Sequence, residues 1–413
     1  MRASETIPRS FRYLIAAWAG SLSGDGLRVV ALPLLAADID RSPAAVAAVA
    51  AATALPWLLI AVPAGTLVDR LNPARTVMLA HLARAVMTAL LVAAMFAGWA
   101  SIPLLCVVGF CITGAETFAD SAAQSLVVRT IPAQLLERAN ARFVTVETIA
   151  LDLVGPLAAG GLYVVARWVP FAVSALLFLV SALVISRLVG LPELAPVQAA
   201  RGRVGAELTS GLRELGSSRV LRVLVITVAV MAIGNAAVDG QLVLYATGPL
   251  ALSKALYPTL LAAYSVGTLV AAAMVGRIAA RYRGGPVMML ALTGIGGTMV
   301  LMGVFPHPAV GWVCYGVMGL AGGTWNVLSA TRRQRSTPHA MIARVSSAFR
   351  VVAWGVTPIG AAIGGAVGEA WNVPAVFIGA GAVILVLGAI VARAFIRPEN
   401  EPPASGPEAR AGD

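Results

Sequence analysis

Long apolar stretches alternate with short polar connections along the whole chain. Twelve stretches are predicted to form helices: residues 12–36, 44–68, 76–98, 102–128, 142–166, 170–190, 220–246, 254–277, 286–305, 309–330, 350–369 and 374–396. Their lengths are close to the roughly 20 residues with which an α-helix crosses a bilayer. The pattern therefore predicts an all-α membrane protein with twelve transmembrane helices.

The composition supports this interpretation. Of the 413 residues, 59% are hydrophobic and 12% are charged, whereas a soluble domain carries about 25% charged residues. Lipid must therefore cover much of the apolar surface, and we expect the lipid bilayer to be a partner of the chain. Cys106, Cys111 and Cys314 all lie in apolar stretches, which favours buried thiols over a disulfide or a metal site.

The basic residues indicate how the helices are oriented. Arginine supplies 29 of the 30 basic residues, which is typical of a GC-rich bacterial genome. With the N-terminus in the cytoplasm, 25 basic residues lie in or beside the inner connections, and the outer loops hold only Arg41, Arg167 and Lys254. The positive-inside rule thus predicts a bacterial plasma (inner) membrane protein with both termini cytoplasmic. The net charge of +11 then requires no nucleic acid as a partner.

One long connection divides the chain into predicted domains. Residues 191–219 are polar and basic, and they separate a first half (1–190) from a second half (220–396). We expect 191–219 to be a cytoplasmic linker. The tail, 397–413, is rich in Pro, Glu, Ala and Gly and is predicted to be disordered.

The two halves repeat each other in sequence. A shift of 206 residues aligns several pairs: Asp120 with Asn326, Arg129 with Arg335, Pro132 with Pro338, Arg138 with Arg344 and Phe143 with Phe349. Internal repeats of this size are typical of secondary transporters. The repeat predicts two pseudo-symmetric six-helix bundles around a central cavity.

The connection after the second stretch carries a recognisable motif. Gly65, Asp69 and Arg70 match the pattern G-x-x-x-D-R-x-G-R-[RK], and Arg75 restores one basic charge. This segment resembles the cytoplasmic signature of the major facilitator superfamily, which implies a cytoplasmic gate at these four residues. Asn72 replaces the second Gly, and we expect it to adopt the left-handed conformation that Gly would adopt there.

A second motif lies in the fifth stretch. Gly155, Pro156, Gly160 and Gly161 resemble the G-P-x-x-G-G element of drug–proton antiporters, with one extra residue. The resemblance implies the branch of the superfamily that holds multidrug, macrolide and siderophore exporters. The chain departs from many proton antiporters because it has no arginine in the middle of the fourth stretch.

Acidic residues inside the predicted spans are candidates for proton coupling. An ionisable group within a span is costly, so it usually faces the protein interior. At about 1.5 Å per residue from the nearest inner arginine, Asp25, Glu116 and Asp152 lie near mid-membrane and Asp120 is shallower. The resemblance implies that spans one and four line the central cavity, which would bring Asp25 and Glu116 together. We hypothesise that Glu116, with Asp25 or Asp152, binds the proton, and that Asp120 is close enough to Glu116 for their charges to repel.

Structural roles remain open for the same acids. Asp25 has Arg28 three residues further on and can form a structural ion pair with it. Arg84, in the third span, can neutralise one acid, and Asp120 can belong to the cytoplasmic gate.

The second half offers a matching polar set. Asn235 and Asp239 lie four residues apart, and Asn326 lies in the tenth predicted span. They can line the cavity or hold helices together by hydrogen bonds.

Several classes of function are excluded by what the sequence lacks. Lys254, the sole lysine, has no glycine-rich segment before it, so there is no phosphate-binding loop for ATP. His81, His307 and His339 are scattered without metal-ligand spacing. We therefore expect no metal, no cofactor and no enzymatic activity, and we expect a proton gradient to be the energy source.

The favoured function is proton-coupled efflux of a small drug-like or secondary-metabolite molecule by alternating access. The alternatives are a proton-coupled uptake carrier and a non-transporting membrane assembly or sensor protein on the same scaffold. The sequence specifies neither the substrate nor the oligomeric state. It is compatible with a monomer.

Overall fold

The computed structural model describes residues 9–68, 71–131, 135–190, 204–338 and 341–396, and this part of the chain is helical, with no strand. The first-half helices are α1 (Arg9–Ile39), α2 (Pro43–Leu59), α3 (Ala61–Val68), α4 (Pro73–Phe96), α5 (Ile102–Thr130), α6 (Leu136–Glu147), η2 (Thr148–Val154), α7 (Gly155–Val165) and α8 (Val169–Ser186). The remaining helices are α9 (Val204–Ser217), α10 (Arg219–Thr247), α11 (Pro258–Arg281), α12 (Gly284–Val304), α13 (Pro308–Arg335), α14 (Ile342–Gly355), α15 (Thr357–Ala370) and α16 (Val373–Ile396). The all-helical fold predicted from the apolar pattern is thus confirmed for the described residues.

The helices are long and apolar enough for a membrane protein. Nine helical segments of the described chain can cross a bilayer by length and composition. The helices α1 and α13, with 31 and 28 residues, and the interrupted pair α2–α3 are not among these nine. Twelve crossings therefore stay a prediction, although each of the twelve apolar stretches lies on one or more of these helices.

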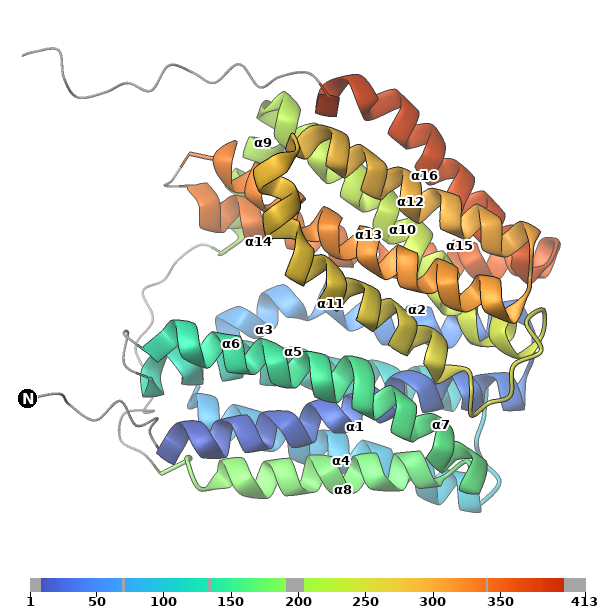
Figure 1. The fold of residues 1–413 in the computed structure, drawn as a ribbon. Helices are drawn as coiled ribbons and strands as arrows, with labels where there is room; N and C mark the ends of the chain where they lie inside the picture. The colour runs from blue at the N-terminus through green and yellow to red at the C-terminus, as the bar shows by residue number, and fades with distance from the viewer. Residues whose placement is uncertain (1–8, 69–70, 132–134, 191–203, 339–340, 397–413) are drawn as a thin grey trace, which may run out of the picture.

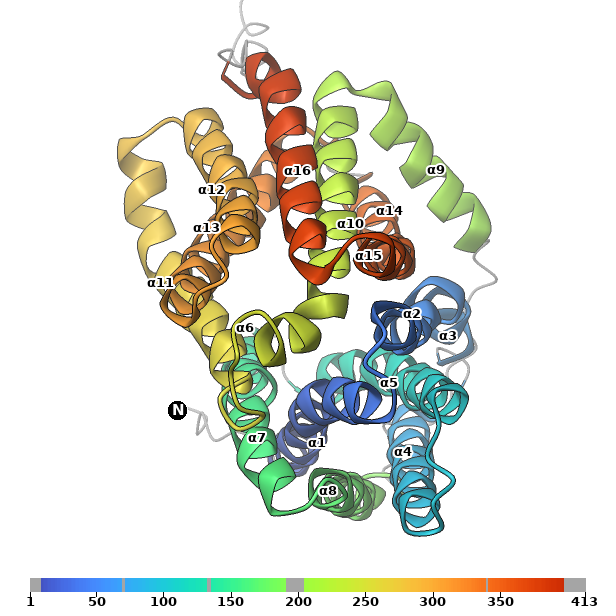
Figure 2. The same ribbon diagram turned by 90° about the vertical axis from the view of Figure 1, so that its right-hand side faces the viewer.

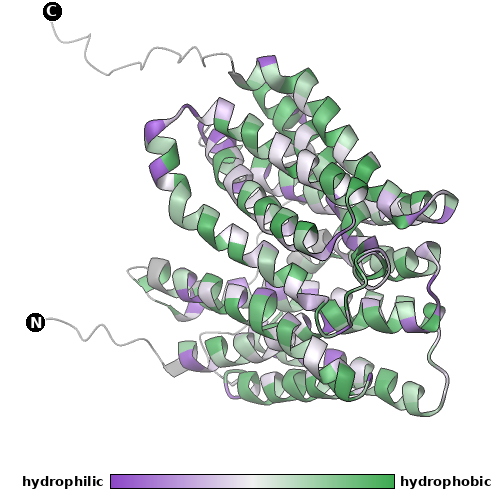
Figure 3. Cartoon of the chain, turned by 45° about the vertical axis from the view of Figure 1, so that its right-hand side comes forward, coloured by the Kyte–Doolittle hydropathy of each residue, from purple (hydrophilic) through white to green (hydrophobic). Residues whose placement is uncertain are grey.

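Apolar side chains cover the outside as well as the core. Large side chains such as Leu183, at 60% exposure, and Ile390, at 72%, point outward. Figure 3 shows hydrophobic residues along most of the length of the helices. Lipid rather than water suits such a surface.

The helices form two groups that meet along two seams (Figure 1). In the first group, α4 packs against α5 and α8, and α1 packs against α8; in the second, α10, α12, α13 and α16 pack together with α11 and α15. Across one seam α2 lies against α15, and across the other α7 lies against α11. Figure 2 shows both seams in an end-on view.

Two hydrogen bonds and one ion pair join the groups at one end of the molecule. Gln241 Nε2 donates to the carbonyl of Pro43 at 3.0 Å, and the Ala44 amide donates to Glu369 Oε2 at 3.4 Å. Lys254 forms an ion pair of 2.5 Å with Asp38. All of these residues lie where α1 and α10 end and α2 begins, at the end of the molecule remote from the start of α1 (Figure 1).

The connections at the repeat have the same layout in both groups. The helices α5 and α6 begin at Ile102 and Leu136, and α13 and α14 begin at Pro308 and Ile342. Both pairs of starts differ by 206 residues, the same shift that aligns the sequences. The repeat therefore extends to the helix boundaries.

Candidate functional site

Three buried charged residues and one partly buried glutamate meet between α1, α4 and α5, and we call them the charged tetrad: Asp25, Arg28, Arg84 and Glu116. Arg28 Nη2 lies 3.3 Å from Asp25 Oδ1 and 3.0 Å from Glu116 Oε2. Arg84 Nη2 pairs with Asp25 Oδ1 and lies 3.7 Å from Glu116 Oε2. Two acids thus face two arginines, and their charges cancel when all four are ionised.

Neutral groups hold the arginines in place. Arg84 donates from Nη1 to Ser21 Oγ at 2.9 Å, and its guanidinium lies 4.0 Å from the ring centre of Phe178 on α8. Arg28 donates from Nη1 to Thr113 Oγ1 at 3.5 Å. Such contacts are needed because an arginine within a membrane is costly unless it is paired and hydrogen-bonded.

The four members differ in access. The side chains of Asp25 and Arg84 are 2% and 1% exposed, whereas that of Glu116 is 17% exposed. Glu116 is therefore the acid of the tetrad that a proton or a solute reaches most easily.

The structure brings Asp25 and Glu116 together, as the resemblance implied, but it places arginines between them. The Asp25–Arg28 pair and the neutralising role of Arg84, which the sequence left as structural alternatives, are both present. The sequence signal for Arg84 was its position inside an apolar span. Its partners could not be identified because they lie on other helices.

Asp120 and Asp152 lie outside the tetrad. Asp120 is half-buried one turn after Glu116 on α5, and it forms no ion pair with any residue that the structure describes. Asp152 lies in the π-helix η2, where its side chain is exposed and its carbonyl accepts from Ser265 Oγ at 2.9 Å. The hypothesis that Asp152 joins Glu116 therefore finds no support in the geometry. A π-turn shifts the helix face by about one residue, which depth counting along an ideal helix cannot include.

The motif that resembles an antiporter element packs helices closely. A Cβ on Gly155 would lie 2.6 Å from Gly26 Cα, next to Asp25 on α1, and one on Gly160 would lie 2.7 Å from Pro258 Cγ of α11. Pro156 is buried in the first turn of α7. Gly161 has open space around it, because a Cβ there would meet nothing within 4 Å.

The candidate gate is partly described. Gly65 lies in α3, Arg75 is exposed in the first turn of α4, and Asp69 and Arg70 lie outside the described residues. Asn72 has φ −70° and ψ 115°, so the expected left-handed conformation is wrong. Asn72 instead caps α4, because its side chain accepts from the Arg75 amide at 3.0 Å.

A cavity of about 440 Å³ lies in the second group, between α10, α11, α13 and α14. Asn235, Asp239 and Asn326, which the sequence proposed as a matching set, all line it. Asp239 Oδ1 accepts from the Tyr315 hydroxyl at 3.2 Å. Tyr315 was missed by the sequence analysis because one tyrosine in an apolar span gives no distinctive signal.

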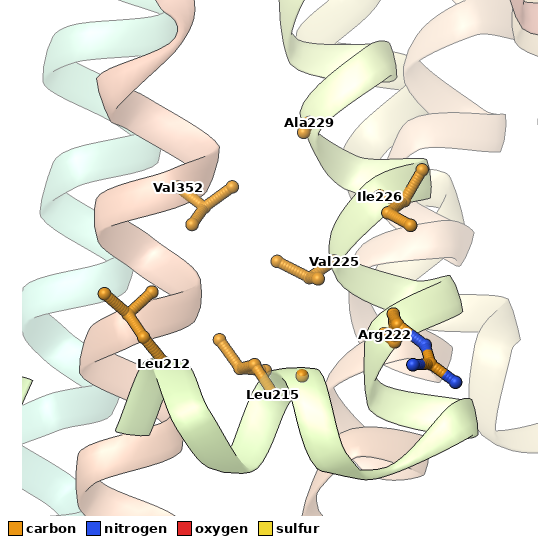
Figure 4. A pocket seen from close by; sticks show the side chains of 8 residues that line it. Leu212, Leu215, Arg222, Val225, Ile226, Ala229 and Val352 are labelled. Carbon is orange, nitrogen blue, oxygen red and sulfur yellow. The ribbon is translucent and has the colours of Figure 1, made fainter. Parts of the chain in front are cut away.

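A smaller pocket of about 240 Å³ lies between α9, α10 and α14. Figure 4 shows that Leu212, Leu215, Val225 and Val352 point into it, with Arg222 at its edge. This pocket is almost wholly apolar and holds no candidate coupling group. No cluster of potential metal ligands occurs in the described part of the chain.

The sequence matches the model of the Major Facilitator Superfamily over residues 14–358. The chain belongs to this superfamily. The chain is 30% identical over 161 residues to the "Uncharacterized MFS-type transporter y4rN" of Sinorhizobium fredii (strain NBRC 101917 / NGR234). That match spans 39% of this chain and 39% of the relative.

Solved transporter structures share the fold over nearly the whole chain. The nucleoside transporter NupG has a TM-score of 0.77 at 12% identity, covering 95% of this chain and 100% of that one. A bacterial homologue of the iron transporter ferroportin, in an inward-facing state, also has a TM-score of 0.77, at 14% identity and the same coverage. A bacterial homologue of the lysosomal transporter Spinster has 0.70 at 14% identity, over 94% of this chain and 97% of that one. The chain thus has the fold of a multi-pass secondary transporter and not that of an enzyme.

Proposed function

We propose that this superfamily member couples proton movement to the efflux of a small drug-like or secondary-metabolite molecule. The observation that carries the proposal is the charged tetrad, in which Glu116 is the accessible acid. Protonating Glu116 would leave the tetrad with one uncompensated positive charge, which is costly within a membrane. Protonation of Glu116 would therefore change the relative stability of conformations that bury the tetrad to different degrees.

Alternating access is supported by the uneven contact between the helix groups. The contacts at Pro43, Gln241 and Lys254 join the groups at one end, and breaking them would let that end open. In this proposal the halves 1–190 and 220–396 rock against each other, twelve helices cross the bacterial inner membrane, and both termini are cytoplasmic. The state described is then closed on the outside.

Export is favoured over uptake by the motif around Gly155 and Gly160, because it resembles the element of drug–proton antiporters. NupG is described as a nucleoside transporter and another of these structures as a homologue of an iron transporter, but at 12–14% identity all three support the fold alone. The substrate proposal therefore rests on the residues of this chain. Proton-coupled uptake on the same scaffold is the second candidate.

Accumulation of antibiotics and dyes in efflux-deficient cells tests the proposal. Cells that express the wild type should accumulate less of at least one compound, and Glu116→Gln or a collapsed proton gradient should restore accumulation. Glu147→Gln is the matched control, because Glu147 is exposed and outside the tetrad. Membrane levels of each variant are measured by immunoblot.

Three results would contradict parts of this proposal. Export that persists in Glu116→Gln would exclude Glu116 as the coupling acid. Greater accumulation in wild-type cells would indicate uptake. The absence of any flux in vesicles with an imposed pH gradient, over a broad panel, would favour a non-transporting protein.

A further inference from the structure

The second-group cavity contains an acid, Asp239, with which no basic residue of the described chain forms an ion pair. Asp239 accepts one hydrogen bond, from the Tyr315 hydroxyl, and forms no ion pair with any described basic residue. This differs from the tetrad, where each acid faces two arginines. The Asp239 side chain is exposed to this cavity, so its carboxylate is accessible to a positively charged partner from outside the protein.

The other charged groups that line the cavity are too far away to fill this role. Arg333 lies 18 residues after Tyr315 on α13, which is about 27 Å along the helix axis. Its guanidinium lies 4.1 Å from the ring centre of Phe349, near Arg350 at the other end of the cavity. The groups close to Asp239 are the neutral phenols of Tyr257, Tyr264 and Tyr315.

A second acceptor lies one helical turn from Asp239. Asn235 is four residues earlier on α10 and lines the same cavity, which places the two Cβ atoms about 5–6 Å apart. The Oδ1 atom of Asn235 is buried and accepts no hydrogen bond from the described residues. A carboxylate and an amide oxygen at this spacing suit one group that carries two N–H donors and a positive charge.

The rest of the cavity suits an apolar body attached to such a group. Tyr264, Trp325 and Trp354 contribute aromatic surface, and Met231 and Met318 contribute flexible apolar side chains. Aromatic rings attract cations through their faces. The volume of about 440 Å³ lies within the range of small-molecule sites.

We propose that this cavity binds amphipathic molecules through a protonated primary or secondary amine, which donates to the Asp239 carboxylate and to Asn235 Oδ1. The site therefore discriminates against quaternary ammonium compounds, which keep the charge but have no N–H. It also discriminates against amides, which keep an N–H but have no charge. The binding of amines by this cavity does not depend on the proposed function. Only the role of that binding in transport rests on it.

Binding to the purified full-length protein in lipid nanodiscs tests the proposal. The probes are dansylcadaverine, its N-acetyl derivative and its N,N,N-trimethyl derivative, which share one fluorophore and one spacer. The wild type should bind dansylcadaverine about tenfold or more tightly than either derivative, because a charged hydrogen bond is lost in each. This comparison needs no mutation, so it stays decisive if a variant fails to fold.

Two substitutions identify the residues responsible. Asp239→Asn should weaken dansylcadaverine binding about tenfold or more and leave the N-acetyl derivative little changed. Asn235→Leu should weaken dansylcadaverine binding but not that of the trimethyl derivative, which makes no hydrogen bond there. Glu147→Gln is the control and should match the wild type.

Equal binding of the three probes, no binding of any of them, or unchanged selectivity in both variants would overturn the proposal. The assay uses neither a proton gradient nor flux, so its outcome is separable from the transport test. Amine selectivity without export contradicts only the proposed function, and export without amine selectivity contradicts only this inference.

Discussion

At the scale of single residues, the protein places acids in the membrane in two ways. Asp25 and Glu116 are held in a network whose charges cancel, with Arg84 bonded to Ser21 and stacked on Phe178. Asp239 accepts a hydrogen bond from the Tyr315 hydroxyl and forms no ion pair with a described residue. In the first arrangement the acids can be buried because arginines pair with them. In the second, the Asp239 carboxylate can attract a cation from outside the protein.

Arg84 is expected to matter more for stability than any exposed arginine. Arg84→Gln leaves Asp25 buried with only Arg28 as its cation, and breaking a buried ion pair costs about 3–5 kcal/mol. The double variant Asp25→Asn with Arg84→Gln keeps the Arg28–Glu116 pair balanced and should recover much of this loss. Thermal unfolding of the purified protein in detergent measures both effects.

Arg75→Gln is the control for this comparison, because Arg75 is exposed and belongs to no described ion pair. Its unfolding temperature should stay close to that of the wild type. A double variant less stable than Arg84→Gln would show that the tetrad is not held together by charge balance.

At the scale of helices, glycine allows α7 to approach α1 next to the tetrad. A Cβ on Gly155 would lie 2.6 Å from both Gly26 Cα and the Ala150 carbonyl oxygen. The π-helix η2 ends directly before Gly155, and π-turns are frequent at functional sites. The close crossing therefore ties the geometry of α7 to the position of Asp25.

Gly155→Ala should separate α1 from α7 and reduce stability by about 1–3 kcal/mol, the usual cost of an added methyl in a tight contact. Gly161→Ala is a matched control within the same motif, because a Cβ there meets nothing within 4 Å. Thermal unfolding and the accumulation assay should both distinguish the two variants. Equal behaviour of the two would contradict the packing role assigned to Gly155.

The sequence predicted the helices better than it predicted their partners. Apolar stretches determine where helices form in a membrane, so the apolar pattern located them and the 206-residue shift located the matching connections. Side-chain partners on different helices leave no such pattern. The pairing of Arg84 with Asp25, the hydrogen bond from Tyr315 to Asp239 and the position of Asp152 in a π-helix outside the tetrad therefore required the structure.

At the scale of the whole molecule, three residues link the helix groups at the end remote from the start of α1. Asp38 lies in the last turn of α1, Tyr163 lies on α7, and Lys254 precedes α11 in the other group. Lys254 Nζ lies 2.5 Å from Asp38 Oδ1, and the Tyr163 hydroxyl donates to Asp38 Oδ2 at 2.9 Å. Alternating access requires this contact to break whenever this end opens.

Removing the Lys254–Asp38 pair is expected to favour opening of this end. The Lys254 side chain is 44% exposed, so the pair contributes only about 0.2–1 kcal/mol, which corresponds to a shift in population of up to about fivefold. Lys254→Gln and Asp38→Asn should each increase the open fraction, measured by spin-label distances between Arg41→Cys and Leu256→Cys on a background without the native cysteines.

The charge-reversed pair Asp38→Lys with Lys254→Asp should restore part of the closed population, because the attraction is kept while the hydrogen bond from Tyr163 is lost. Identical distance distributions in all four proteins would show that the contact does not hold this end closed, and the apolar seam between α2 and α15 would then be the element that does.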